Sequence, residues 1–174
     1  MNAGQTCIAP DYVYVKEEVL GDWMEATNNS ISLMYPSIFD NDDYTSVVNE
    51  GHYARLDGYI EDAKDKGADV IEINPANESE SEKTHNKMMP TVILNATEEM
   101  LVMQEEIFGP LLPVVEYDDI DEATALINSK DRPLGLYYFG DNKSEEDDLE
   151  IEDDFLGTKI VSPSCKEKSN LGSD

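Results

Sequence analysis

The first nine residues contain a thiol in a setting suited to nucleophilic chemistry. Cys7 lies among small and polar neighbours, just ahead of the β-type run at residues 12–15, so its sulfur is predicted at a loop-to-strand junction. A thiolate there could attack a carbonyl carbon if backbone N–H groups stabilised the oxyanion, and Gly4 would let the backbone approach a substrate closely. The alternative is that Cys7 is a small, buried hydrophobic residue.

A second group of chemically useful residues is Gln104-Glu-Glu-Ile-Phe-Gly-Pro110. The Gly109-Pro110 turn should project the preceding side chains from the end of an element. If the segment is extended, Glu106 and Phe108 point the same way. The carboxylate could then accept hydrogen bonds from a ribose diol while the ring flanks a flat heterocycle. The alternative is an ordinary solvated helix end.

The elements that must position these residues alternate between strand and helix. Hydrophobic patterns predict strands at residues 12–15, 68–73, 89–94, 111–115 and 134–139. Helical patterns cover residues 17–35, 51–66, a short turn at 97–104, and 120–129, where Ala123, Leu126 and Ile127 should face inward. Pro36 should end the first helix and Gly67 should follow the second. This spacing predicts an α/β fold with a mostly parallel sheet covered by helices.

Composition limits the classes of function. The chain has 174 residues and 40% hydrophobic content, enough for one domain with a core. It has no run of eighteen apolar residues and no signal-peptide pattern, so we expect a cytoplasmic protein. The formal net charge of -27 argues against nucleic acid or an anionic membrane as a partner. Cys7 and Cys165 form no cluster with histidines, so no metal site is proposed.

The last part of the chain differs from the rest. Residues 144–154 are almost all acidic, and a Ser/Lys-rich end follows. A helix of such composition would repel itself through like charges one turn apart. We therefore predict that residues 1–143 form the folded segment and that residues 144–174 form a poorly ordered acidic tail.

Taken together, the two motifs resemble the catalytic-domain portion of the aldehyde dehydrogenase superfamily. The matching runs are Asn2-Ala-Gly-Gln-Thr-Cys-Ile-Ala9 and Gln104-Glu-Glu-Ile-Phe-Gly-Pro-Leu-Leu-Pro113. The segments between them are similar to the coniferyl aldehyde dehydrogenase branch, notably at Asp43-Tyr-Thr-Ser46, His52-Tyr-Ala-Arg-Leu56, Val70-Ile-Glu-Ile-Asn-Pro75 and Arg132-Pro-Leu134. The resemblance covers about residues 1–143.

The resemblance implies oxidation of an aldehyde, such as coniferyl aldehyde or another aromatic or apolar aldehyde, to the acid with NAD or NADP. Cys7 would be the nucleophile that forms a thiohemiacetal and then a thioester. Glu106 would hold the nicotinamide ribose, with Phe108 packed beside it, and Thr6 and Ile8 would line the aldehyde pocket. The family also implies a homo-oligomer when the protein is complete.

Other parts of the family pattern cannot be placed on this sequence. It contains no Gly-x-Gly-x-x-Gly turn for a dinucleotide, and the family's general-base glutamate and second oxyanion donor have no counterpart in it. The family's glycine-rich segment after about residue 143 is also absent. We therefore expect a truncated form of the catalytic domain, with negligible turnover on its own.

Three functions remain open at this point. The chain could be part of an aldehyde dehydrogenase. It could instead be an inactive domain that only associates with a dehydrogenase subunit or another protein. A third possibility is thiol chemistry at Cys7 without NAD. The preferred aldehyde, the choice of NAD or NADP and the oligomeric state are not determined by the sequence.

Overall fold

The computed structural model describes residues 2–83, 85–131 and 133–140, and the backbone of residues 158–162. The chain divides into two compact units, Met1–Asp118 and Asp119–Asp174, and each is described by itself. Both candidate motifs fall in the first unit, so the argument about the site depends on that unit alone.

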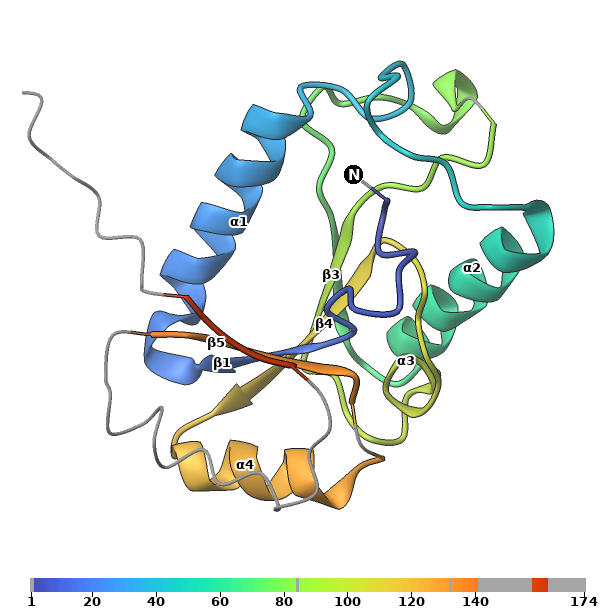
Figure 1. Cartoon of the computed structure of the whole chain (residues 1–174). Coiled ribbons are helices and arrows are strands. Elements are labelled where there is room, and N and C mark those ends of the chain that lie inside the picture. The colour runs from blue at the N-terminus through green and yellow to red at the C-terminus, as the bar shows by residue number, and fades with distance from the viewer. Residues whose placement is uncertain (1, 84, 132, 141–157, 163–174) are drawn as a thin grey trace, which may run out of the picture. The chain divides into compact units, whose positions relative to one another are not determined.

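A four-stranded sheet forms the centre of the first unit (Figure 1). Its strands are β1 (Val13–Lys16), β2 (Asp69–Glu72), β3 (Thr91–Leu94) and β4 (Leu111–Tyr117), in the spatial order β1-β4-β3-β2. Strands β1 and β3 both run parallel to β4, whereas β2 is antiparallel to β3. The expected mostly parallel sheet is therefore confirmed.

Helices cover both faces of this sheet. A 3₁₀ turn (Glu17–Val19) leads into α1 (Leu20–Met34), which packs against Val92 of β3 and Val114 of β4. On the other face, α2 (Glu50–Asp65) and the short α3 (Leu101–Gln104) pack against Ile93 and Leu111. Figure 1 shows α1 and α2 on opposite sides of the sheet. Because both faces are buried, adjacent strand residues point into different cores.

The helix ends follow from local chemistry. The side chain of Asn49 caps α2 by accepting a hydrogen bond from the backbone N–H of His52 at 2.9 Å. Gly67 follows α2 with a φ of +87°, the left-handed conformation predicted for a residue after a helix. Helix α1 ends at Met34 because the residue before Pro36 is driven out of the helical region.

Two prolines adjust the strand boundaries. Strand β3 begins at Thr91, later than predicted, because Pro90 has no N–H to give to the ladder. Strand β4 continues through Pro113 to Tyr117. Pro113 is tolerated because β4 changes partner there: β3 pairs with residues 111–113 and β1 with residues 114–117.

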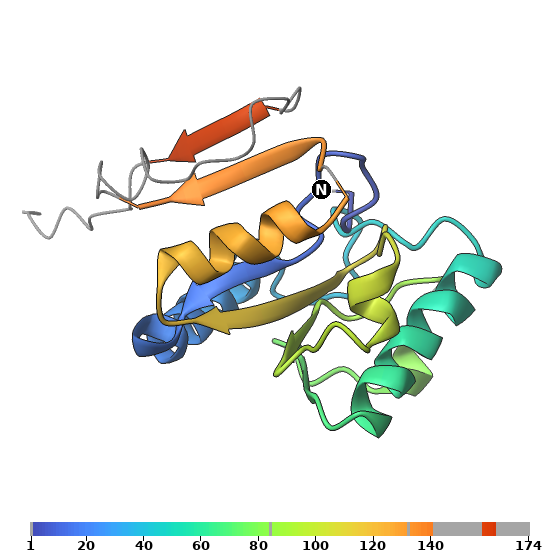
Figure 2. The ribbon, with the colours of Figure 1, turned by 90° about the horizontal axis from the view of Figure 1, so that it is seen from below.

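The second unit contains α4 (Ile120–Ser129), β5 (Gly135–Phe139) and β6 (Thr158–Ser162), drawn in orange and red in Figure 2. Strands β5 and β6 pair in parallel. Helix α4 has the predicted bounds, but only Ala123 and Ile127 of its three predicted inward residues are buried; Leu126 is 37% exposed. Strand β6 falls within the predicted tail, and the rest of residues 144–174 lies outside the described residues.

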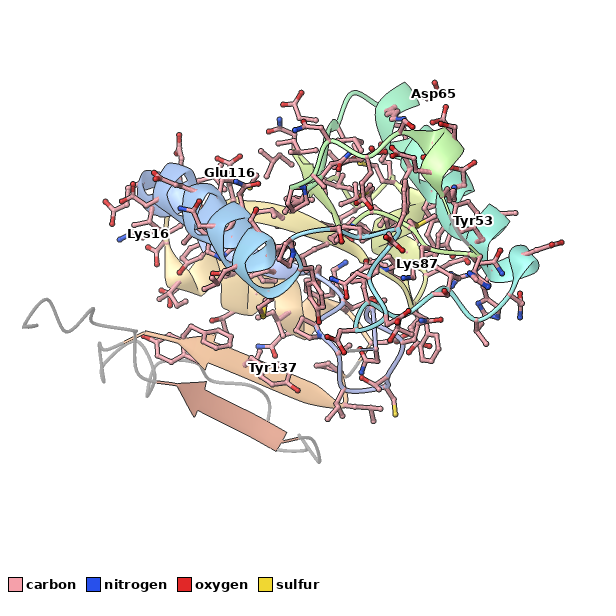
Figure 3. The ribbon with its side chains drawn as sticks, turned by 90° about the horizontal axis from the view of Figure 1, so that it is seen from above. Lys16, Tyr53, Asp65, Lys87, Glu116 and Tyr137 are labelled. Atoms are coloured by element: carbon pink, nitrogen blue, oxygen red, sulfur yellow. The ribbon has the colours of Figure 1, made fainter. Side chains whose placement is uncertain are left out.

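The loop after α1 is fixed to the loop before β3 by side chains that bind backbone atoms. The Glu78 carboxylate accepts hydrogen bonds from the N–H groups of Ile38 at 2.6 Å and Phe39 at 2.9 Å. The Tyr44 hydroxyl donates to the Met88 carbonyl at 2.9 Å. Lys87, labelled in Figure 3, donates to the carbonyl of Asn41 in the loop after α1. These hydrogen bonds hold the two irregular loops together.

We expect Glu78→Ala to destabilise the first unit by about 2 kcal/mol, because N–H groups beside the buried Ile38 and Phe39 lose a charged acceptor. Urea unfolding followed by fluorescence measures the loss. Glu80→Ala is the matched control, since the Glu80 side chain is exposed and forms a surface salt bridge with Lys83. Equal losses for the two variants would contradict the assigned role of Glu78.

Among the described residues, no helix combines the length and the apolar character that crossing a bilayer requires.

Candidate functional site

The loop that carries Cys7 is a compact turn organised by Asn2. The side chain of Asn2 accepts from the Gly4 N–H at 3.1 Å and donates to the Thr6 hydroxyl at 3.0 Å. Ala3 and Gly4 both have positive φ values, +51° and +75°. Cys7 follows this turn with its thiol exposed and unpaired with another cysteine. The alternative of a buried, purely hydrophobic Cys7 is therefore wrong.

Gln5 fixes this turn to the rest of the unit. Its side-chain amide donates to the Ser46 carbonyl at 3.0 Å and accepts from the Val48 N–H at 2.9 Å. The exposed thiol thus sits on a backbone that is bonded to the segment leading into α2, although no regular element precedes it in the described chain.

The two sequence motifs meet through their glycines. A Cβ placed on Gly4 would lie 2.2 Å from the carbonyl oxygen of Gly109, and one placed on Gly109 would lie 2.4 Å from a methyl carbon of Leu56. Figure 1 shows the N-terminal loop, in dark blue, beside the segment between α3 and β4. Gly4 was expected to let the backbone approach a substrate closely. In the structure, the absence of a side chain at Gly4 lets the two loops contact each other.

Glu106 and Phe108 both lie in the short loop between α3 and β4. Glu106 is exposed, Phe108 is half-buried, and Ile107 between them is 1% exposed and belongs to the core next to α2. Phe108 has a φ of +48°, so the loop is not extended. The extended backbone on which the predicted alignment of Glu106 and Phe108 depended is therefore not present.

Thr6 and Ile8, the predicted pocket residues, flank Cys7 on the same turn. Both are exposed, and Ile8 is 60% exposed. An apolar side chain with this exposure beside a thiol is available to contact a ligand, and neither residue lines the pocket beside α2 that is described below.

Sequence reasoning missed two residues that hold the loop of Glu106. Arg55 of α2 donates to the carbonyls of Glu106 and Ile107 at 3.0 and 2.6 Å. Asp11 accepts from the Ile107 N–H at 2.9 Å. The sequence could have pointed to Arg55, because this residue lies in the run at residues 52–56 that supported the family resemblance. No local pattern pointed to Asp11.

A pocket of about 240 Å³ opens elsewhere, between α2 and the segments around β2 and β3. Its walls combine charged side chains with Tyr53, which Figure 3 labels, and with Met88 and Met89. None of the five predicted site residues lines it. The candidate site is therefore an exposed surface made by two loops and not this pocket.

Comparison with known proteins gives the relationship directly. Residues 1–149 match the aldehyde dehydrogenase family. A probable coniferyl aldehyde dehydrogenase of Caulobacter vibrioides is 51% identical over 147 residues, which are 84% of this chain and 30% of that protein. The coniferyl aldehyde dehydrogenase of a Pseudomonas species is 48% identical over 148 residues, 85% of this chain and 31% of that protein.

Solved structures agree. The substrate-bound AldH of Staphylococcus aureus superposes with a TM-score of 0.77 at 31% identity, over 93% of this chain and 34% of that one. A 3,6-anhydro-L-galactose dehydrogenase in complex with NAP gives a TM-score of 0.76 at 26% identity, over 95% of this chain and 35% of that one. This chain spans about a third of the length of these proteins. It belongs to the aldehyde dehydrogenase family.

Proposed function

We propose that this chain supplies the nucleophile and part of the cofactor site for NAD(P)-dependent oxidation of coniferyl aldehyde or a similar aromatic or apolar aldehyde. The observation that carries the proposal is the Gly4–Gly109 contact. It places the loop of an exposed thiol against the loop of an exposed carboxylate and a half-buried aromatic ring. The relatives named as coniferyl aldehyde dehydrogenases support this substrate class.

Cys7 would act first, because its thiolate can add to the aldehyde carbon and form a thiohemiacetal. The backbone N–H of Cys7 would donate to the developing oxyanion. A bound nicotinamide would supply the hydride acceptor for that carbon. Loss of the hydride leaves a thioester on the Cys7 sulfur. Water would then cleave the thioester, releasing the carboxylic acid and returning the thiol.

The residues of the second loop fit a nicotinamide nucleotide. The exposed Glu106 carboxylate has two oxygens that can accept from the two hydroxyls of a ribose diol, and the half-buried Phe108 offers a ring edge or face to a flat heterocycle. Thr6 and Ile8 would contact the aldehyde from either side of Cys7. We propose a homo-oligomer as the complete form, because the family resemblance implies one. We also propose a cytoplasmic location, as the composition led us to expect.

The test is a pair of proteins. The first is the 174-residue chain by itself. The second is a chimera in which this chain replaces the matching segment of the Caulobacter vibrioides relative, which supplies the remaining parts of a dehydrogenase. With coniferyl aldehyde and NAD or NADP, we expect steady reduced-cofactor formation from the chimera and none measurable from the chain alone.

A folded, oligomeric chimera that binds the cofactor but oxidises no aldehyde would contradict the proposed function. Steady turnover by the isolated chain would contradict the expectation that it needs complementary parts. The unmodified relative, assayed in parallel, sets the scale for both comparisons.

A further inference from the structure

The peptide group between Glu106 and Ile107 is held from two sides by side chains of other elements. Arg55 donates from its two terminal nitrogens to the carbonyl of Glu106 at 3.0 Å and to that of Ile107 at 2.6 Å. From the segment before β1, the Asp11 carboxylate accepts the Ile107 N–H at 2.9 Å. Two consecutive carbonyls and the N–H between them are thus all bound by charged side chains.

The guanidinium of Arg55 is itself held in place. It donates to the Tyr59 hydroxyl at 2.8 Å and lies 5.0 Å from the centre of the Tyr59 ring. Tyr59 is 3% exposed and donates to the Glu105 carboxylate at 2.6 Å. Burial, together with this hydrogen bond to Glu105, raises the pKa of Tyr59, so the phenol stays protonated and keeps donating. The bonds connect one face of α2 to three consecutive loop residues.

These hydrogen bonds involve backbone atoms of the loop and not the side chains of Glu106 and Phe108, which are proposed to contact the cofactor. The Ile107 side chain is anchored in the core, whereas the Glu106 carboxylate is exposed and the Phe108 ring is half-buried. Fixing the 106–107 peptide sets the direction of the Glu106 Cα–Cβ bond. It also fixes the backbone that leads into Phe108, which adopts a φ of +48°. A backbone held this firmly would present both side chains without loop rearrangement.

We propose that Arg55 and Asp11 are positioning residues for Glu106 and Phe108. They act through the backbone of Glu106 and Ile107 and thereby set how the nicotinamide ribose is held. This inference rests on the proposed function and deepens it. Asp11 also lies four positions after Cys7, so the same bond fixes the spacing between the nucleophile's segment and the cofactor loop.

The variants are compared in the chimera described above, with the chain otherwise complete. Arg55→Lys keeps the charge, but a single ammonium replaces the two-pronged guanidinium. Asp11→Ala removes the acceptor, and Asp11→Asn restores an uncharged one. We expect Arg55→Lys and Asp11→Ala each to raise KM for the cofactor about tenfold, with KM for the aldehyde nearly unchanged. Asp11→Asn should recover most of the loss.

A double-mutant cycle with Glu106→Gln shows whether the effect passes through Glu106. If it does, Arg55→Lys should raise the cofactor KM much less in the Glu106→Gln background than in the parent. Lys64→Gln, on an exposed position of the same helix, is the matched control and should leave both KM values unchanged. Hydrogen exchange of the Ile107 amide should become faster in Asp11→Ala.

The outcomes separate this inference from the function on which it rests. If Glu106→Gln leaves the cofactor KM unchanged, the proposed role of Glu106 in the cofactor site is wrong. If Glu106→Gln raises that KM but the effects of Arg55→Lys and Asp11→Ala are fully additive with it, the positioning role is overturned. Equal changes in both KM values and in kcat would also overturn it, because they indicate general loss of structure. Tyr59→Phe, which removes one hydroxyl, keeps the test open if Arg55→Lys does not fold.

Discussion

Replacing Cys7 by serine in the chimera is expected to lower aldehyde oxidation at least roughly a thousandfold, because an alcohol is a far weaker nucleophile than a thiolate. The thiol is exposed at the surface of its turn, so the substitution removes no core packing. Cofactor binding should be retained, since Glu106 and Phe108 lie on the other loop. Steady-state oxidation of coniferyl aldehyde and a separate cofactor titration measure the two properties.

Cys165→Ser is the matched control, as it removes the chain's other thiol. Iodoacetamide labelling of the 174-residue chain, followed by mass spectrometry across pH, gives an independent readout. Cys7 should be labelled readily, because its side chain is exposed. A Cys7→Ser chimera that keeps more than about a tenth of the parent rate would exclude Cys7 as the nucleophile.

Gly4→Ala is expected to reduce oxidation about a hundredfold, because displacing the nucleophile's loop by even one ångström disturbs the reacting geometry. The new methyl carbon would sit 2.2 Å from the Gly109 carbonyl oxygen, and that atom belongs to backbone that Arg55 and Asp11 hold nearby. A residue with a φ of +75° also gains about 1–2 kcal/mol of strain on acquiring a Cβ. The N-terminal loop must therefore move away from the loop of Glu106.

Two other glycines separate the causes. Gly67 has a φ of +87°, but a Cβ placed on it would meet no atom within 4 Å, so Gly67→Ala tests backbone strain without a clash. Gly58 lies inside α2 with open space around it, and Gly58→Ala should stabilise the helix by about 0.5–1 kcal/mol. If Gly67→Ala loses as much activity as Gly4→Ala, the contact between the two loops is not what matters.

Much of the fold could be predicted from local patterns. The hydrophobic periods placed α1 and α2 within a few residues and matched the bounds of α4, because these elements bury one face at regular intervals. The end of α1 before Pro36 and the left-handed Gly67 followed from backbone restrictions that act within a few residues. The parallel sheet followed from the alternation of strand and helix.

Local patterns were less informative where a partner comes from elsewhere in the chain. Leu126 lies on the same helical pattern as Ala123 and Ile127 but is exposed, because the surroundings of α4 decide how wide its buried face is. Strand β6 forms in a stretch whose composition predicted little order, since β5 supplies the backbone partner. Neither the surroundings of α4 nor the pairing of β6 with β5 can be read from a short window of sequence.

The sequence by itself determined the chemistry that is available here: a thiol in a glycine-containing loop, and a carboxylate and a ring before a Gly-Pro turn. Only the tertiary structure decided that Gly4 rests on Gly109 and that Arg55 and Asp11 hold the 106–107 peptide. The alternation of side chains along an extended segment likewise did not predict the positive φ of Phe108. The physical reason is that periodicity reports which side chains are buried, whereas contacts between loops depend on backbone distances that are set only when the sheet and α2 come together.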